Sequence, residues 1–441
     1  MSSAEERRKP QSILLRVGLI RCVTLGASLI ASLAVARTVL MAAGTATFAA
    51  FALIQSLFAL IPFLDFGVGA AVTNAAADRR EAQFIDILRQ ALRVTGLSAL
   101  ITVVIASGLT ALDLWEAILG PVIGASGSSV LVNLVCFAIA LPLGLGARVL
   151  LGLGRQGLLA IVQALPTPCT LVVVLLGAQS ESQATILNAP GLGLLCSAAV
   201  GAACAWIVAR RSLQDDENLE ESRRYPTNTF GRVSSSAFIM TIMMLVGFQS
   251  DRLVLSHTVD VGELALYSLV AQFFSPVWLL ISAVGQSLWA HYRSRPSAAS
   301  NLRSVSLSFF AASMLLSGVV GIASYWGAPL LSDGQIQTNV LICVGFLIML
   351  AIRSAQLPLG MYLTDDEGFK LQALWSVPGM FLNVSLSILL AISIGPSGPL
   401  FATAIGTALF SLVPCAVEVR RRTGVATDGL TPRTALSGEV S

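Results

Sequence analysis

Apolar residues fall along the chain in blocks of roughly 20, the length that crosses a bilayer as a helix, and short polar segments separate the blocks. The pattern predicts an all-α polytopic membrane protein with twelve transmembrane helices. The predicted spans are 17–40, 48–71, 91–112, 130–151, 158–176, 192–209, 233–255, 264–290, 302–325, 340–363, 369–392 and 399–419.

The longest polar connection, 210–232, follows the sixth predicted span and divides the chain into two six-helix lobes. We expect an N-lobe over 17–209 and a C-lobe over 233–419, with 210–232 as a cytoplasmic linker. The tails, 1–16 and 420–441, are the remaining segments.

Basic residues predict the orientation of these spans. Every loop after an odd-numbered span lacks Lys and Arg, whereas the tails and the other loops hold nearly all of them. Because basic loops stay on the cytoplasmic side, both termini are predicted to be cytoplasmic. The basic positions are Arg7, Arg8, Lys9, Arg79, Arg80, Arg89, Arg155, Arg210, Arg211, Arg223, Arg224, Arg293, Arg295, Lys370, Arg420, Arg421 and Arg422.

The two halves carry three similar segments in the same order. Arg37 followed by 44–51 matches Arg252 followed by 260–267, 141–144 matches 357–360, and 193–201 matches 398–406. Since each half contains an even number of spans, the halves share one orientation and form a parallel repeat, with a pseudo-twofold axis along the membrane normal. This arrangement is typical of alternating-access transporters, whose substrate site lies between the halves.

Composition narrows the class further. Of the 441 residues, 55% are apolar and 12% charged, whereas soluble domains carry about 25% charged residues, so a soluble enzyme is excluded. A net charge of +3 gives no reason to expect nucleic-acid binding. The seven cysteines lie inside apolar blocks without Cys-x-x-Cys or Cys/His clusters, so neither a metal site nor a cofactor is expected.

Charged residues inside the predicted spans are the candidate functional residues. Each isolated charge at the centre of a span costs about 2.5–3.5 kcal/mol on insertion scales, so such side chains usually face a partner or a wet cavity. Arg148, near a cytoplasmic helix end, is expected to be an interface anchor. The full set is Arg21, Arg37, Asp65, Arg148, Asp251, Arg252 and Arg353.

Arg353 lies midway along the tenth span, beyond snorkelling distance from either interface. It is a candidate contact for a diphosphate or an acidic sugar, because guanidinium binds such oxyanions bidentately and stays charged. Alternatively, it pairs with an acid on another helix. Arg37 and Arg252, near the outer ends of matching spans, either contact an anion at the outward mouth or snorkel to headgroups, with Asp251 beside Arg252.

Arg21 and Asp65 lie at similar depths in the cytoplasmic thirds of adjacent antiparallel spans. One interpretation is an ion pair between them. In the other, Asp65 is a proton or sodium site whose protonation frees Arg21, which couples transport to an ion gradient.

Several segments resemble polysaccharide (O-antigen type) flippases of the multidrug/oligosaccharidyl-lipid/polysaccharide exporter superfamily. They are Ala36-Arg37, Gly44 to Phe51, Leu64 to Gly69, Gly152 to Arg155, Asp251 to Leu255, Gly262 to Tyr267 and Gly395 to Gly406. The resemblance implies a two-lobed bacterial inner-membrane protein that moves a polyprenyl-diphosphate-linked oligosaccharide from the cytoplasmic to the periplasmic leaflet. Its implied partners are that lipid-linked glycan, membrane lipids and other polysaccharide-assembly proteins.

The favoured function is therefore a flippase whose substrate headgroup contacts Arg353, Arg37 and Arg252. A multidrug or cation antiporter of the same superfamily is an alternative, although intramembrane Arg outnumbers Asp by five to two. A membrane glycan polymerase or glycosyltransferase is a third candidate, but it generally needs a sizeable polar loop, and every outward loop here is short. We accordingly expect a transporter and not an enzyme.

Overall fold

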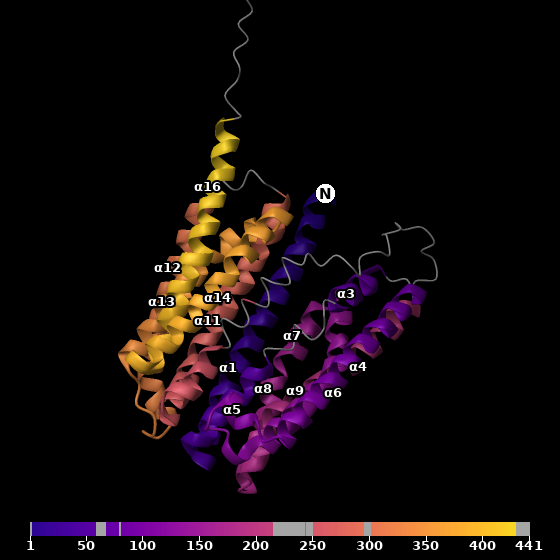
Figure 1. Ribbon diagram of the computed structural model, residues 1–441. Coiled ribbons are helices and arrows are strands. Elements are labelled where there is room, and N and C mark those ends of the chain that lie inside the picture. The colour runs from indigo at the N-terminus through magenta and orange to yellow at the C-terminus, as the bar shows by residue number, and fades with distance from the viewer. Residues whose placement is uncertain are drawn as a thin grey trace, which may run out of the picture.

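The structure is a computed structural model that describes residues 2–58, 68–78, 81–214, 243, 250–294 and 301–428. These residues form helices and short connections, and no strand occurs among them. The all-α prediction is confirmed, and the chain folds as a multi-pass membrane protein (Figure 1).

The described helices follow the predicted lobes. The N-lobe contains α1 (Ser2–Leu57), α3 (Val68–Asp78), α4 (Glu81–Ala111), α5 (Trp115–Leu119), η2 (Gly124–Ser126), α6 (Gly127–Gly152), α7 (Gln156–Ala164), α8 (Pro166–Gln179) and α9 (Gln183–Gln214). The C-lobe contains helical residues 250–258, α11 (Val261–Ser294), α12 (Leu302–Leu331), α13 (Val340–Tyr362), α14 (Asp366–Ile394), η5 (Gly395–Ser397), α15 (Gly398–Thr407), the π-helical η6 (Ala408–Leu412) and α16 (Val413–Asp428).

Nine helical segments of the described chain are long and apolar enough to cross a membrane. Two of the nine, Val23–Leu57 and Glu367–Thr423, each include parts of two predicted spans. Residues 59–67 and 215–242, which belong to the second and seventh predicted spans and to the linker 210–232, lie outside the described residues. The count of twelve spans and the domain boundaries therefore stay predictions.

Two breaks in the helices have local causes. Within α1, Gly44 has φ 77°, a conformation that only glycine adopts readily, so two helices meet there inside the predicted loop 41–47. The predicted fifth span is divided between α7 and α8, where Pro166 occupies the first turn of α8. Proline is tolerated in that position because the backbone N–H it lacks has no helical partner there.

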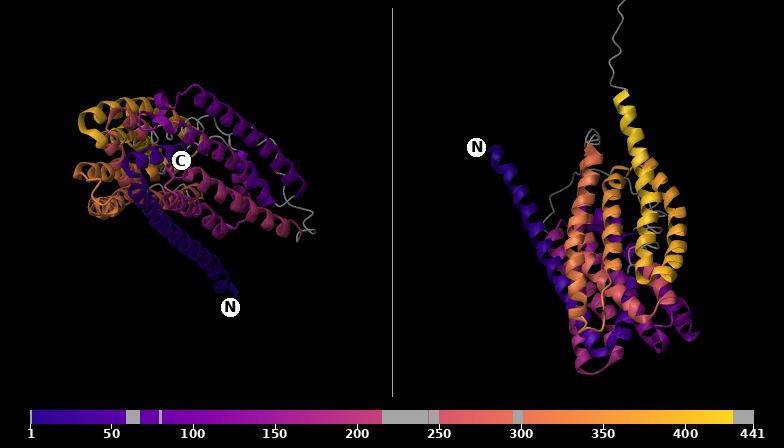
Figure 2. Two further views of the ribbon diagram at one scale, coloured as in Figure 1. Left: turned by 90° about the horizontal axis from the view of Figure 1, so that it is seen from below. Right: turned by 90° about the vertical axis from the view of Figure 1, so that its left-hand side faces the viewer.

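The helices form two groups that meet at one end and diverge at the other. In Figure 1, α11–α14 and α16 lie on the left, α3–α9 lie on the right, and the groups approach each other at the bottom. Seen from below in Figure 2, the two groups lie side by side. The start of α1 and the end of α16 both lie at the diverging end, which carries the basic residues and is the predicted cytoplasmic side.

The buried core has the same division. One cluster combines residues of both lobes near the predicted outer loops, including Leu40, Phe48, Phe51 and Ile54 with Leu255, Leu264, Val270 and Phe274. Near the diverging end the cores are separate. The N-lobe core includes Val68, Val72, Phe84, Leu150 and Leu159, and the C-lobe core includes Tyr292, Leu302, Leu363, Cys415 and Val419. The lobes are therefore closed at the predicted outer end and open toward the predicted cytoplasm.

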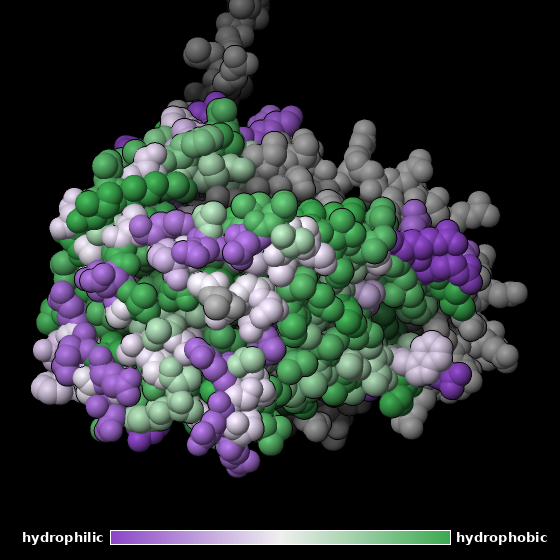
Figure 3. Space-filling view, turned by 60° about the horizontal axis from the view of Figure 1, so that its bottom comes forward, coloured by the Kyte–Doolittle hydropathy of each residue, from purple (hydrophilic) through white to green (hydrophobic). Residues whose placement is uncertain are grey.

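Large apolar side chains cover much of the outer surface of the bundle. Leu100 and Val104 on α4 are 60% and 62% exposed, and Leu315 and Ile322 on α12 are 71% and 68% exposed. Contiguous exposed apolar surface of this kind marks a surface that meets lipid. Figure 3 shows broad hydrophobic areas, with hydrophilic residues scattered across the end at which the lobes meet.

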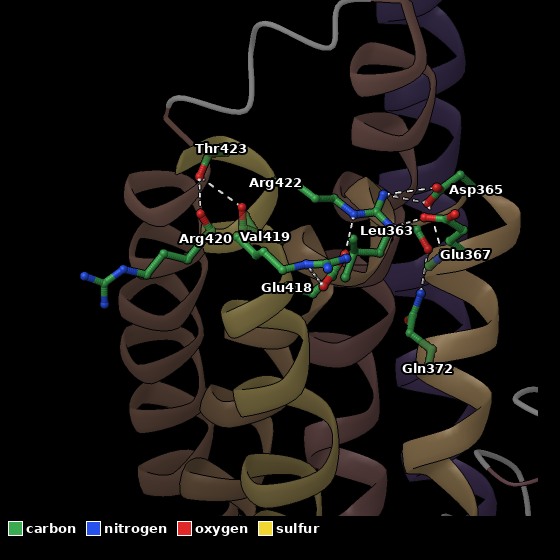
Figure 4. A network of polar contacts seen from close by, with 11 residues as sticks. Leu363, Asp365, Glu367, Gln372, Glu418, Val419, Arg420, Arg422 and Thr423 are labelled. Atoms are coloured by element: carbon green, nitrogen blue, oxygen red, sulfur yellow. Dashed lines mark hydrogen bonds and ion pairs between the residues drawn. The ribbon is translucent and has the colours of Figure 1, made fainter. Parts of the chain in front are cut away.

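At the diverging end, α16 is fastened to the turn between α13 and α14 (Figure 4). Arg422 donates to both carboxylate oxygens of Asp365 at 3.0 Å and to Glu418 at 2.8 Å. Asp365 also caps α14 by accepting from the Gly368 N–H. The acidic turn is thus a helix cap that binds the last helix of the C-lobe.

Candidate functional site

Arg353 lies on α13 beside a cavity inside the C-lobe. Its guanidinium carbon is 3.9 Å from the centroid of the Trp278 ring on α11, a cation–π distance. The cavity has a volume of about 640 Å³, and its other polar and aromatic lining residues include Gln356, Gln372, Trp375, Ser376, Thr407 and Ser411. The structure therefore places this predicted site residue on a cavity wall made by helices α11, α13 and α14 and the α15–α16 segment.

Asp251 is the carboxylate nearest in influence to Arg353. It is 4% exposed, and the Tyr267 hydroxyl donates to its Oδ2 at 3.1 Å. Its Oδ1 is buried without a hydrogen-bond partner among the described residues. Asp251 also interacts electrostatically with Arg353 and Arg252. A carboxylate in this position offsets positive charge in the C-lobe and keeps one oxygen available for a proton or cation.

Arg37 and Arg252 lie near the end at which the lobes meet. Arg37 Nη1 donates to the backbone oxygens of Leu330 at 3.0 Å and Leu331 at 3.4 Å. Arg252 Nη1 donates to the backbone oxygen of Ala52 at 3.3 Å. Both guanidiniums therefore contact backbone of the opposite lobe, and neither lines the Arg353 cavity.

The remaining predicted pair is not tested. Arg21 belongs to α1, whereas Asp65 lies outside the described residues. Whether these residues form an ion pair or an ion-coupling site stays a prediction.

A second cavity, also of about 640 Å³, lies mainly in the N-lobe and was not predicted from the sequence. Its polar lining consists of uncharged hydroxyl and amide side chains: Ser32, Gln55, Thr167, Thr170 and Gln272. Gln272 comes from α11 of the C-lobe, and the Ser32 hydroxyl donates to its Oε1 at 3.1 Å, so the cavity adjoins the lobe interface. The available signal was two glutamines inside otherwise apolar blocks.

Comparison with known proteins identifies the fold. No family model matches this sequence, and no curated protein matches it. The solved structure of the lipid II flippase MurJ in an inward closed conformation superposes with a TM-score of 0.67 at 12% identity, covering 91% of this chain and 87% of that one.

Multidrug transporters superpose as well. A multidrug resistance MATE family transporter of the MOP superfamily, in an inward-facing conformation, gives a TM-score of 0.59 at 14% identity, covering 93% of this chain and 99% of that chain. The MATE multidrug transporter DinF-BH, solved as a complex, gives 0.58 at 15% identity, covering 93% and 96%. These similar proteins are transporters and flippases, not enzymes, and this chain has their fold.

Proposed function

We propose that this protein is an alternating-access flippase of the polysaccharide flippase family. It moves a polyprenyl-diphosphate-linked oligosaccharide from the cytoplasmic to the periplasmic leaflet of a bacterial inner membrane. The observation that carries the proposal is the position of Arg353, which stacks on Trp278 at the wall of a cavity within the membrane-spanning part of the C-lobe.

The chemistry of the Arg353 cavity suits a diphosphate. A guanidinium presents paired N–H donors to two phosphate oxygens, and stacking on an aromatic ring holds its plane while leaving those donors directed outward. Asp251 offsets the charge of Arg353 when no anion is bound. Gln356 and Gln372 on the same wall supply amide groups for the polar parts of the headgroup.

The N-lobe cavity suits the sugar part of the same substrate. Hydroxyl and amide side chains such as Gln55 and Thr170 match the donors and acceptors of an uncharged saccharide. With the lobes open toward the predicted cytoplasm, the headgroup enters between the two cavities while the polyprenyl tail stays in the lipid. The folds of the lipid II flippase and of the MATE transporters support this class of transport cycle.

Ion coupling is part of the proposal. Asp251 has an unpartnered carboxylate oxygen and influences Arg353, so a proton on Asp251 strengthens the attraction of Arg353 for an anion. Asp65 with Arg21 is the second candidate for coupling. Arg37 and Arg252 provide cationic contacts at the outer mouth once the lobes separate there. Other polysaccharide-assembly proteins are the proposed partners.

The test is flipping of a fluorescent polyprenyl-diphosphate-linked disaccharide in proteoliposomes, followed by an impermeant quencher. We expect Arg353→Ala to abolish flipping and Arg353→Lys to restore only part of it, because an ammonium lacks the paired donors. Arg303→Ala, an exposed arginine on α12, serves as the matched control. Undiminished flipping by Arg353→Ala would remove Arg353 from the site.

A multidrug or cation antiporter is the second candidate function, favoured by the buried Asp251 and by the aromatic walls of the C-lobe cavity. Cation extrusion from cells that is lost in Asp251→Asn but retained in Arg353→Ala would favour the antiporter. Loss of glycan export in Arg353→Ala without any effect on cation extrusion would favour the flippase.

A further inference from the structure

Two arginines at matching positions of the repeat reach from one lobe to the other. Arg37, on α1 of the N-lobe, donates to the oxygens of Leu330 and Leu331 at the end of α12 in the C-lobe. Arg252, in the C-lobe, donates to the oxygen of Ala52 in the second half of α1. The repeat thus produces two reciprocal cross-lobe contacts at the predicted outer end.

The acceptors explain why arginine suits the Arg37 position. The last four carbonyls of a helix have no partner within the helix, and they form the negative end of its dipole. Leu330 and Leu331 are the last two residues of α12, so one guanidinium bonds two such oxygens. Since those oxygens belong to the other lobe, the bonds exist only while the outer ends are together.

The surrounding seam is closed by direct backbone contact. Gly120, between α5 and η2, has φ 91°, and a Cβ built on it would lie 2.5 Å from the backbone oxygen of Ser256 in the opposite lobe. The shared core that includes Phe51 and Leu264 fills the space beneath. Opening the outer end must therefore break the Arg37 and Arg252 bonds and separate this seam.

We infer that Arg37 and Arg252 form an outer latch that stabilises the outward-closed state of the transport cycle. Each guanidinium exchanges backbone oxygens of the opposite lobe for water or an anion when the outer end opens. Because arginine stays protonated, the latch operates at any physiological pH. The inference goes beyond the proposed function and does not depend on the nature of the cargo.

Snorkelling of these side chains to lipid headgroups is the alternative, and the two interpretations differ in a measurable way. A snorkelling arginine anchors its helix at the interface in both conformations, so its removal leaves the balance between conformations unchanged. A latch residue contacts the opposite lobe in one conformation only, so its removal shifts the balance toward the outward-open state.

The experiment measures access to the seam from outside. Ser256→Cys places a thiol at a position that is 4% exposed and faces Gly120, where an impermeant maleimide reacts only when the outer ends separate. Labelling is followed in intact cells without any added substrate, and the protein with Ser256 intact gives the background from native cysteines. Failure of the proposed cargo therefore does not affect the result.

In this background we expect Arg37→Ala and Arg252→Ala each to raise the labelling rate roughly tenfold, since a hydrogen bond from a charged donor is worth that factor or more. The double substitution should raise it further. Arg37→Glu should exceed Arg37→Ala, because a carboxylate faces the negative end of α12. Arg303→Ala, at the start of the same helix, should leave the rate unchanged.

Lysine substitutions cover the case in which an alanine variant fails to accumulate. Arg37→Lys retains the charge but not the fork that reaches two oxygens, so its labelling rate should lie between those of the parent and the alanine variant. Unchanged labelling in the double alanine variant at normal abundance, or in both lysine variants where alanine is not tolerated, would overturn the latch.

Discussion

The two lobes derive from matching halves of the sequence, yet their cavities differ in chemistry. The C-lobe cavity contains a guanidinium stacked on an indole, with a buried carboxylate nearby. The polar lining of the N-lobe cavity consists of hydroxyl and amide groups. A repeated fold can therefore bind the two ends of an asymmetric headgroup, with the anion on one wall and the uncharged sugar on the other.

The largest effect that would break this comparison is expected at Asp251. Asp251→Asn keeps an acceptor for the Tyr267 hydroxyl but removes the negative charge that offsets Arg353. We expect flipping to fall at least tenfold and to lose its response to an imposed pH gradient, because the amide mimics a permanently protonated acid. Flipping assays in vesicles with and without a pH gradient measure both effects. A gradient response equal to that of the parent would exclude Asp251 from coupling.

A smaller effect is expected on the N-lobe wall. Gln55→Leu removes an amide from the cavity without altering any charge. We expect a several-fold loss of flipping for the glycosylated lipid, in line with about 0.5–1.5 kcal/mol for a neutral hydrogen bond. The sugar-free polyprenyl diphosphate should be unaffected.

Gln179→Leu, an exposed glutamine at the end of α8, is the matched control for this substitution. Equal losses for both lipids with Gln55→Leu would show that the N-lobe wall does not distinguish sugar from diphosphate.

The smallest effect is expected at Arg422, away from both cavities. Arg422→Ala removes its bonds to Asp365 and Glu418 at the cytoplasmic end of the C-lobe. Partly exposed ion pairs contribute up to about 1 kcal/mol each, so the melting temperature should fall by a few degrees at most. Flipping rates at room temperature should match those of the parent, and a large loss of flipping would show that this fastening takes part in the cycle.

Helices and charge were accessible to sequence reasoning because membrane insertion imposes a simple rule on each of them. Apolar blocks predicted the helices, and the cost of a buried charge identified Arg353 as a residue with a cavity or a partner. The ring of Trp278, 75 positions away in the sequence, was not predictable, because the pairing depends on how α11 and α13 pack.

The features that the sequence did not predict share a physical cause. Hydroxyl and amide residues such as Gln55 and Thr170 are common in membrane helices, so nothing in the pattern distinguished those that line a cavity. The acceptors of Arg37 and Arg252 are backbone oxygens, which every residue possesses and no sequence pattern reports. The closed outer end and open inner end depend on tertiary packing between lobes, which the period of the helices does not specify.

The divided core makes the outer seam a fulcrum. Residues there, such as Phe51 and Leu264, belong to one hydrophobic cluster that spans both lobes, whereas the residues near the opposite end support a single lobe each. Altered packing at the fulcrum changes how the protein divides its time between its two shapes. Altered packing in a single-lobe core changes how long the protein survives in the cell, so evolution can tune speed and durability at separate addresses.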